Sequence, residues 1–336
     1  MEQENNAAGR AAAHAFVSAP VSTAGHALRT TRASAHAHRL RLCAPRRAVA
    51  NARRTQVRCQ SLDNDDVLVI PNRKRNLEIQ VEGVKIVYDY YPGEKGPIVM
   101  YLPGFFYARS RTAKVNALQT ACNRRAQGFL ALDYYGTDRS GGEFANGTVS
   151  RWVKDVVTIL DQILPNKKVV LVGSGIGGWV MLHVAIQRPE AVVGLVGLSA
   201  DPDFTERLLM PALSETQREE LDSKGIIDLT WGYRKYPISK KLVDDGRNML
   251  VLTGEKDSLP ITCPVRLIQG LADEELPSTF PLEIVEKIRS TDVNVTFVKY
   301  GDHALENDSD FKLMINAVKE VSDLYFEYDL RSPTSG

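Results

Sequence analysis

Cysteine and long apolar runs are the scarcest features of this sequence. Only four cysteines are present, and the two beyond residue 60, Cys122 and Cys263, are too far apart for a metal-binding motif or a disulfide framework. No stretch after residue 61 reaches the roughly 18 uninterrupted apolar residues that a membrane span needs. We therefore predict no metal site and no membrane span in this part of the chain.

Acidic residues are nearly absent from residues 1–60, which contain ten arginines, no lysine and only Glu2 and Glu4 as acids. Alanine, arginine and serine dominate this stretch, and it lacks the apolar core of a secretory signal. We expect residues 1–60 to be a disordered organellar transit peptide. The sequence at residues 55–61 is typical of a plastid processing site, which favours a chloroplast, with a mitochondrion second. The alternative is a basic tail that stays attached.

Basic residues are correspondingly scarce in the remainder of the chain. The net charge of the whole sequence is only +1, so the part after residue 60 is acidic once the arginine-rich start is set aside. An acidic domain offers no basic surface for nucleic acid, and no nucleic-acid partner is expected. The hydrophobic share of 43% and the charged share of 25% are those of a globular protein, and we expect one large domain over residues 62–330.

Short apolar runs alternate with helical patterns along this domain. Strands are predicted at residues 77–81, 84–90, 98–102, 129–133, 169–172, 191–198, 265–268 and 293–300, and helices at 110–127, 149–164, 176–187, 281–290 and 308–327. Most of these strands are apolar throughout, which favours an α/β fold with a mostly parallel sheet and helices on both faces. The alternation breaks between residues 199 and 262. This stretch, whose clearest helical pattern is 214–224, is expected to be a cap insertion.

Small residues crowd together at 173–177, where Gly-Ser-Gly-Ile-Gly joins a predicted strand to a predicted helix. A strand, a tight turn and a helix in this order are the context of a nucleophile elbow, whose tip residue points up from the carboxyl edge of the sheet. The flanking residues must be small because the two backbones pass closely. Gly173 and Gly177 meet this need, so the tip is Gly175, which has no side chain. A shifted register with Ser174 at the tip would put two β-branched residues at the flanks.

An acid and a histidine follow the elbow in the chain order expected of a catalytic triad. Asp273 lies in the loop after one predicted strand, and His303 follows the last predicted strand. The carboxyl ends of parallel strands meet at one edge of a sheet, where a carboxylate can orient an imidazole. These two residues are therefore the candidate acid and base. His183, in the middle of a helix, is expected to be a packed core residue.

Two backbone N–H groups are candidates for an oxyanion hole. The first belongs to Ile176, at the N-terminus of the helix after the elbow, where the helix dipole also favours negative charge. The second belongs to Phe105, in the Pro-Gly-Phe-Phe loop after the strand at 98–102. The two phenylalanines of this loop are expected either to line an acyl pocket or to pack in the core.

Several motifs together resemble the α/β-hydrolase superfamily: Pro-Gly-Phe after a strand, Asp-Tyr-Tyr-Gly at 133–136, the elbow followed by Gly-Trp, the run at 263–270 and Asp-His at 302–303. Over about residues 80–325 the chain is most similar to the mitochondrial α/β-hydrolase-domain thioesterase that cleaves acyl-proteins and acyl glucuronides, and to its bacterial relatives. The resemblance implies serine-hydrolase action on acyl esters, thioesters or acylated proteins, with Asp273 as the acid and His303 as the base. Those relatives carry serine where this chain has Gly175.

The missing nucleophile leaves several interpretations open. A covalent acyl-enzyme cannot form at Gly175, so one interpretation is a pseudohydrolase that binds a ligand or a protein without turnover. In a second, Asp273 and His303 act as a general base on water or on an acidic substrate proton. In a third, Ser174 takes over after local distortion of the turn. In a fourth, Gly175 is a sequence change in an ordinary hydrolase.

A dinucleotide-binding oxidoreductase is the remote alternative. Residues 173–178 nearly match the Gly-x-Gly-x-x-Gly fingerprint, but that motif usually belongs to the first βαβ unit of a fold, and here it follows several strands. The same glycines lack the lysine of a phosphate-binding loop. We therefore predict no cofactor.

Overall fold

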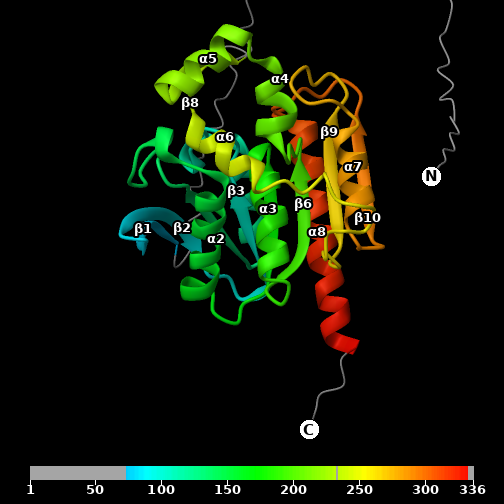
Figure 1. The fold of residues 1–336 in the computed structure, drawn as a ribbon. Coiled ribbons are helices and arrows are strands. Elements are labelled where there is room, and N and C mark those ends of the chain that lie inside the picture. Colours follow the sequence, from blue (N-terminus) through cyan, green and yellow to red (C-terminus); the bar gives the residue numbers. More distant parts are fainter. Residues whose placement is uncertain (1–72, 232–233, 332–336) are drawn as a thin grey trace, which may run out of the picture. The chain divides into compact units, whose positions relative to one another are not determined.

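A computed structural model describes residues 73–331, apart from residues 232 and 233. The predicted transit peptide at residues 1–60 lies outside these described residues. Figure 1 shows a central sheet with helices on both faces and a group of short elements above one end of the sheet. No helix in the described part of the chain is both long enough and apolar enough to cross a membrane.

Eight strands form the sheet, in the order β1-β2-β4-β3-β5-β6-β9-β10. Their bounds are β1 Lys74–Val81, β2 Val84–Tyr91, β3 Lys95–Leu102, β4 Gln127–Asp133, β5 Val169–Ser174, β6 Val192–Leu198, β9 Val265–Gly270 and β10 Val293–Val298. The pairs β1–β2 and β2–β4 are antiparallel, and every later pair is parallel. The predicted mostly parallel sheet is confirmed. Its central strand β5 carries the elbow.

Both faces of the sheet are covered by helices, as the apolar strands require. The helices around the sheet are α1 Ala113–Arg124, α2 Val149–Ile163, α3 Ile176–Gln187, α7 Phe280–Lys287 and α8 Asp308–Arg331. In β3, Met100 and Leu102 pack into the core beneath α2 and α3, whereas Val99 and Tyr101 pack into the opposite core beneath α1 and α8. This alternation along one strand explains why its sequence is apolar without interruption.

Residues 199–262, the cap segment, lie between β6 and β9. They contain a short π-helical turn at Thr205–Leu209, α4 Met210–Ala212, α5 Glu215–Lys224, β7 Ile226–Trp231, β8 Arg234–Ser239 and α6 Lys240–Arg247. The helical pattern predicted at 214–224 is α5, which starts with a capping box between Ser214 and Gln217. The β7–β8 hairpin was not among the strands predicted from the sequence. Ile227 and Leu229 are buried while Asp228 between them is exposed, an alternation too short to be distinctive in the sequence.

Candidate active site

The turn between β5 and α3 has the backbone of a nucleophile elbow, and Gly175 is its tip, with φ 54° and ψ −126°. Close backbone contacts explain the glycines on either side. A Cβ on Gly177 would lie 2.2 Å from the carbonyl oxygen of Leu102, and a Cβ on Gly173 would lie 2.5 Å from that of Gly177. Ser174 belongs to the extended strand β5 and pairs in register with β6. The register with Ser174 at the tip is therefore not the one that the chain adopts.

Space for a side chain exists at the tip although the sequence places none there. A Cβ built on Gly175 would lie 3.7 Å from His303 Nε2, 3.7 Å from Asp201 Oδ2 and 3.8 Å from Gly104 Cα. All three are ordinary van der Waals distances. The Cβ of a serine would therefore not displace its neighbours, which include a histidine and a carboxyl group.

Asp273 and His303 lie together at the carboxyl edge of the sheet, in the loops after β9 and β10. His303 Nδ1 is 2.9 Å from Asp273 Oδ2. An ionised carboxylate can only accept hydrogen bonds, so Nδ1 carries the hydrogen and Nε2 is left as the acceptor that faces Gly175. The structure thus brings together the acid, the base and the elbow that the sequence singles out.

The surroundings of Asp273 keep it ionised. Its side chain is fully buried, and its Oδ1 accepts hydrogen bonds from the backbone N–H groups of Glu275 and Leu276, each at 2.9 Å. Gln269 Nε2 donates to Oδ2, also at 2.9 Å. Burial opposes ionisation, but His303 and these backbone donors outweigh it and lower the pKa of Asp273. For His303, burial lowers the pKa, but the hydrogen bond and charge of Asp273 outweigh burial and raise it.

Asp201 is a site residue that the sequence analysis missed. It lies three residues after the end of β6, is 6% exposed, and its backbone N–H donates to the carbonyl oxygen of Gly175 at 3.3 Å. Burial, the largest cause, raises the pKa of the Asp201 carboxyl to about 8; the charge of His303 lowers it, and Asp273 and Glu275 raise it further. An acid within three residues of the end of a buried strand was the available signal, but the sequence does not show that β6 lies beside β5.

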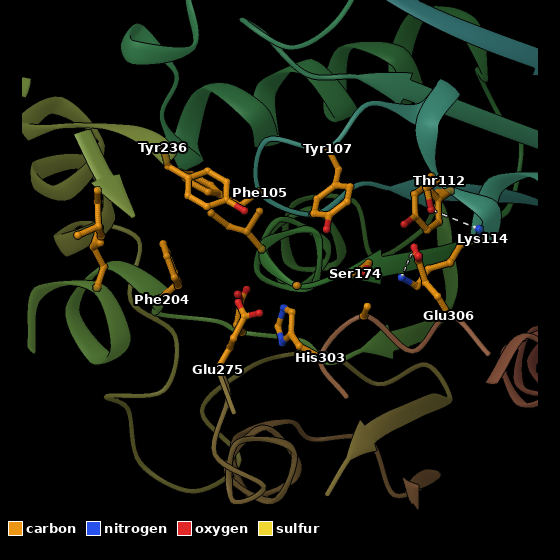
Figure 2. A pocket seen from close by; sticks show the side chains of 18 of the residues that line it. Phe105, Tyr107, Thr112, Lys114, Ser174, Phe204, Tyr236, Glu275, His303 and Glu306 are labelled. Carbon is orange, nitrogen blue, oxygen red and sulfur yellow. Dashed lines mark hydrogen bonds and ion pairs between the residues drawn. The ribbon is translucent and has the colours of Figure 1, made fainter. Parts of the chain in front are cut away.

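The pocket over the elbow has two chemically different ends (Figure 2) and encloses about 860 Å³, including its open mouth. One end is mostly apolar and holds the rings of Phe105, Phe204 and Tyr236. The pocket is also lined by Leu209, Leu229 and Ile238 from the cap segment. The other end is polar and is lined by Tyr107, Thr112, Lys114, Ser174 and Glu306. His303 lies between the two ends in Figure 2. The arrangement can hold an apolar group on one side of the histidine and a polar group on the other.

Ser174 lies on the polar side of the pocket (Figure 2). The buried hydroxyl of Tyr101 interacts with the side chains of Thr112 and Ser174, and burial raises the pKa of Tyr101 to about 12. Lys114 is 5% exposed, and its Nζ is 3.5 Å from Glu306 Oε1. The sequence carries no signal for this buried lysine, because it lies on a helix of ordinary composition.

Phe105 both lines the pocket and packs against other aromatic rings. Its ring centroid is 5.0 Å from that of Phe144, 5.5 Å from Tyr236 and 6.1 Å from Trp152. The loop that carries it is anchored by a buried ion pair between Arg109 and Asp133. The two outcomes expected for this phenylalanine, pocket lining and core packing, are therefore both found.

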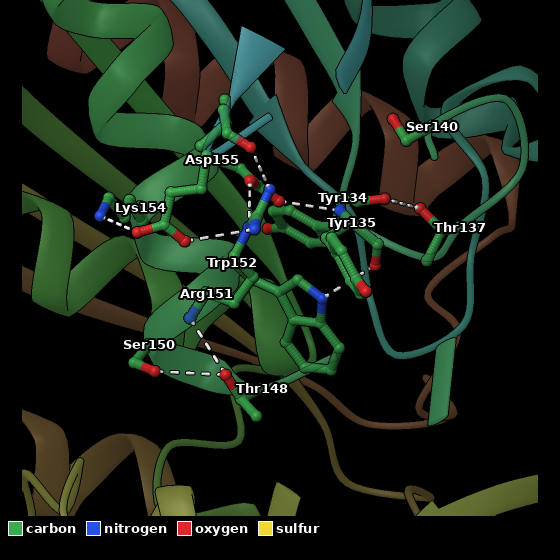
Figure 3. Close-up of polar contacts among 12 residues, drawn as sticks. Tyr134, Tyr135, Thr137, Ser140, Thr148, Ser150, Arg151, Trp152, Lys154 and Asp155 are labelled. Atoms are coloured by element: carbon green, nitrogen blue, oxygen red, sulfur yellow. Dashed lines mark hydrogen bonds and ion pairs between the residues drawn. The ribbon is translucent and has the colours of Figure 1, made fainter. Parts of the chain in front are cut away.

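A polar network behind this aromatic wall fixes Trp152 (Figure 3). Trp152 Nε1 donates to the carbonyl oxygen of Tyr135 at 3.2 Å, and the Tyr135 N–H donates to Asp155 Oδ2 at 2.8 Å. Arg151 Nε donates to the other oxygen of Asp155 at 3.0 Å. Burial raises the pKa of Asp155 to about 6, and these hydrogen bonds act against that effect. The network holds one wall of the pocket in place.

Two further residues singled out in the sequence are Ile176 and His183. Ile176 is the first residue of α3, and its N–H has no partner within the helix, as at every helix start. His183 Nε2 lies 2.8 Å from the carbonyl oxygen of Met249, and burial lowers the pKa of this histidine. His183 therefore contacts the cap segment and is half-buried, less deep than the core position expected of it. Among the residues that the structure describes, no cluster of potential ligands could hold a metal ion.

Known proteins resemble this chain in sequence. A family model described as the alpha/beta hydrolase family matches residues 99–296. The mitochondrial palmitoyl-protein thioesterase ABHD10 of Mus musculus is 35% identical over 234 residues, which cover 68% of this chain and 76% of the mouse protein. The Homo sapiens protein of the same name is 29% identical, with 68% and 74% covered.

Solved structures agree. The crystal structure of a hydrolase from Agrobacterium vitis S4 superposes with a TM-score of 0.68 at 30% identity and covers 74% of this chain and 98% of that one. The mouse alpha/beta hydrolase domain-containing protein 10 gives a TM-score of 0.67, also at 30% identity, with the same coverage. The esterase Est1E of Butyrivibrio proteoclasticus, at 18% identity and a TM-score of 0.59, shares the fold.

Proposed function

Because the chain belongs to the α/β-hydrolase family, we propose that it hydrolyses acyl esters or thioesters without a side-chain nucleophile. The observation that carries the proposal is the hydrogen-bonded pair of Asp273 and His303, whose Nε2 faces an open elbow tip. A base that is oriented in this way is suited to take up a proton at that point. Because the serine is absent, the attacking oxygen comes from water instead of a serine hydroxyl.

The reaction has two steps. In the first, His303 Nε2 takes a proton from a water molecule as the water oxygen bonds to the acyl carbon, and the carbonyl oxygen gains the negative charge. The backbone N–H groups of Ile176 and Phe105 stabilise that charge. In the second step the bond to the leaving group breaks, and the alkoxide or thiolate takes the proton from Nε2. The products are a carboxylic acid and an alcohol or a thiol.

The expected rate is low. Removal of a triad member from a serine hydrolase leaves a residual acceleration of roughly 10³–10⁴ over water, supplied by the oxyanion hole and binding. A chain with Gly175 retains these parts together with an oriented base. Turnover in this range is slow but measurable with an activated ester.

The two ends of the pocket suggest how a substrate is oriented. The acyl chain occupies the apolar end, beside Phe204 and Leu229, and the leaving group lies toward the polar end near Lys114. The relatives named palmitoyl-protein thioesterases support thioesters and acylated proteins as the substrate class. A small acyl ester is the simplest probe of this class.

Binding without turnover is the second candidate function. It is favoured by one observation, the glycine at a tip that has room for serine. In this case the pocket recognises an ester, a thioester or an acylated protein and releases it unchanged. Protection of the cap segment from protease by a bound acyl ligand, without release of product, would support this second function.

Kinetics of the full chain distinguish the two functions. We expect wild type to hydrolyse p-nitrophenyl butyrate and a butyryl thioester above background, and His303→Ala to lose this rate. His183→Gln is the matched control, because His183 contacts Met249 in the cap segment and has no role in the reaction. Equal, background-level rates for wild type and His303→Ala on both substrates would contradict the proposed hydrolysis.

We also propose that residues 1–60 direct import into an organelle. Their arginine-rich, acid-poor composition supports import, and the mitochondrial relatives support the mitochondrion over the chloroplast. A fusion of residues 1–60 to a fluorescent protein should accumulate in mitochondria. Accumulation in plastids would restore the chloroplast assignment, and a diffuse signal would contradict import.

A further inference from the structure

Two proton-binding side chains border the space that the missing nucleophile leaves. The position of a Cβ on Gly175 is 3.7 Å from Asp201 Oδ2 and 3.7 Å from His303 Nε2. The two groups come from different loops, Asp201 from the loop after β6 and His303 from the loop after β10. A serine Cβ would be in van der Waals contact with both. The side chains remaining around the tip are therefore a carboxyl group and an imidazole.

Asp201 has fewer partners than a structural aspartate: beyond the backbone N–H of its own residue, no hydrogen bond to its carboxyl is found among the described residues. Its side chain is 6% exposed, and in the described part of the chain its Oδ1 accepts no hydrogen bond. Asp203, two residues later, is also buried, but its two oxygens accept the N–H groups of Val251 and Leu252 at 2.7 and 2.8 Å. A buried carboxyl with an unsatisfied oxygen costs folding free energy. Such a cost beside the reacting position is typical of a functional residue.

We infer that Asp201 is a catalytic residue, which together with His303 holds the attacking water in the place of the absent serine side chain. This inference rests on the proposed hydrolysis, because it names the group that positions water in that reaction. One hydrogen of the water is donated to Asp201 Oδ2 and the other to His303 Nε2. The lone pair of the water oxygen is then free to bond to the acyl carbon.

The proton balance of the reaction is unchanged by Asp201. As the oxygen–carbon bond forms, the proton moves from water to His303 Nε2, and the remaining O–H stays hydrogen-bonded to Asp201. The proton on Nε2 leaves with the alcohol or thiol when the acyl bond breaks. Asp201 orients the water, donates no proton and forms no covalent bond. A fixed water saves the entropy that a freely diffusing nucleophile would lose in the transition state.

Ionisation of Asp201 should appear in the dependence of rate on pH. Burial raises the pKa of Asp201 to about 8, His303 lowers it, and Asp273 and Glu275, in the loop after β9, raise it. A carboxylate accepts a hydrogen bond from water more strongly than a neutral carboxyl does. The rate should therefore rise once where His303 loses its proton, and again as the pH passes about 8.

The test compares four full-length proteins on p-nitrophenyl butyrate between pH 5 and 10: wild type, Asp201→Asn, His303→Ala and Asp203→Asn. Asp201→Asn keeps the shape of the side chain and removes its charge. Above pH 8, where Asp201 of wild type is charged, we expect kcat to fall about 10-fold to 100-fold with little change in KM, and the rise near pH 8 to disappear. Its melting temperature should equal or exceed that of wild type. Asp203→Asn, the matched control, should melt at a lower temperature and keep the rise near pH 8.

Four results would overturn the inference. The first is an Asp201→Asn protein with the kcat and pH profile of wild type. The second is a parallel loss of kcat and melting temperature in Asp201→Asn, which would make its role structural. The third is a wild-type rate that falls above pH 8, which would make Asp201 a proton donor. The fourth is ¹⁸O in the Asp201 peptide after turnover in H₂¹⁸O, which would show direct attack by the carboxylate.

Failure of the proposed hydrolysis gives a different pattern. If wild type and His303→Ala share the background rate, the hydrolysis itself is refuted, and the role of Asp201 falls with it. If wild type is active and depends on His303 while Asp201→Asn behaves as wild type, only the role of Asp201 is refuted.

Discussion

Restoring the nucleophile with Gly175→Ser is the most direct test of the site. The new Cβ would meet its nearest neighbours at 3.7 to 3.8 Å, so no side chain has to move. The cost lies in the backbone, because φ is 54° at this residue. A side chain at such an angle costs roughly 1–2 kcal/mol, which should lower the melting temperature by a few degrees without preventing folding.

The expected gain in activity is far larger than this cost. In a complete triad, removal of the serine lowers kcat by about 10⁶-fold. The Asp273–His303 pair is already in place, but Asp201 Oδ2 lies as close to the new side chain as His303 Nε2 does and competes for its hydroxyl. We therefore expect a rise in kcat of at least about 100-fold, and a further rise in Gly175→Ser/Asp201→Ala.

A fluorophosphonate probe, which bonds covalently to activated serines, gives the readout. Gly175→Ser should be labelled at position 175, and adding His303→Ala should abolish the labelling. Wild type, which has Ser174 next to the tip, is the matched control and should stay unlabelled. A folded Gly175→Ser protein that reacts no faster than wild type would refute the assignment of Gly175 as the nucleophile position. Labelling of wild type at Ser174 would refute it as well.

Three further changes probe the acid, the buried carboxyl and the turn. Asp273→Asn should lower kcat by about 10²–10⁴-fold, because His303 loses the carboxylate that fixes its tautomer; an unchanged rate would contradict the dyad. Asp201→Asn should stabilise the fold at pH 7 by up to about 4 kcal/mol but not at pH 4, because the wild-type folded state keeps a proton that the unfolded chain releases above its pKa of 3.8. The free energy of unfolding of wild type should thus fall as the pH rises from about 4 to about 8. Urea unfolding of wild type and Asp201→Asn at pH 4, 7 and 9 measures this effect. A difference between the two proteins that does not change with pH would contradict it. Gly177→Ala should cost about 3 kcal/mol or more because its Cβ meets the carbonyl oxygen of Leu102 at 2.2 Å, whereas Gly225→Ala, at φ 76° with open space around it, should cost about 1 kcal/mol; equal losses would contradict the steric argument.

Local sequence determines the elbow, which is why it could be predicted. The contacts that require Gly173 and Gly177 are made within the strand–turn–helix unit and with the strand next to it. The meeting of Asp273 and His303 could also be predicted, because both follow strands of a parallel sheet and the order of the two residues in the chain is informative. The fold class follows from the same alternation of strands and helices.

Features that depend on the order of strands in the sheet could not be predicted from the sequence. Asp201 faces the tip only because β6 pairs with β5, and a sequence with eight strands permits many orders. The apolar end of the pocket depends on how the cap segment folds back, so Leu229 and Tyr236 carry no signal of their own. The β7–β8 hairpin that carries them is short and only partly apolar, so its sequence shows no clear strand periodicity.

The conformation of Gly175 has a genetic consequence. Glycine and serine codons can differ by a single nucleotide, and this turn accepts either residue without rearranging the chain around it. Glycine adopts a positive φ freely, so a lineage that loses the serine gains a slightly more stable protein instead of a damaged one. Selection for stability therefore cannot purge the change, and selection for activity can reverse it with one mutation. The elbow is a point at which catalysis can be lost and recovered while the fold persists.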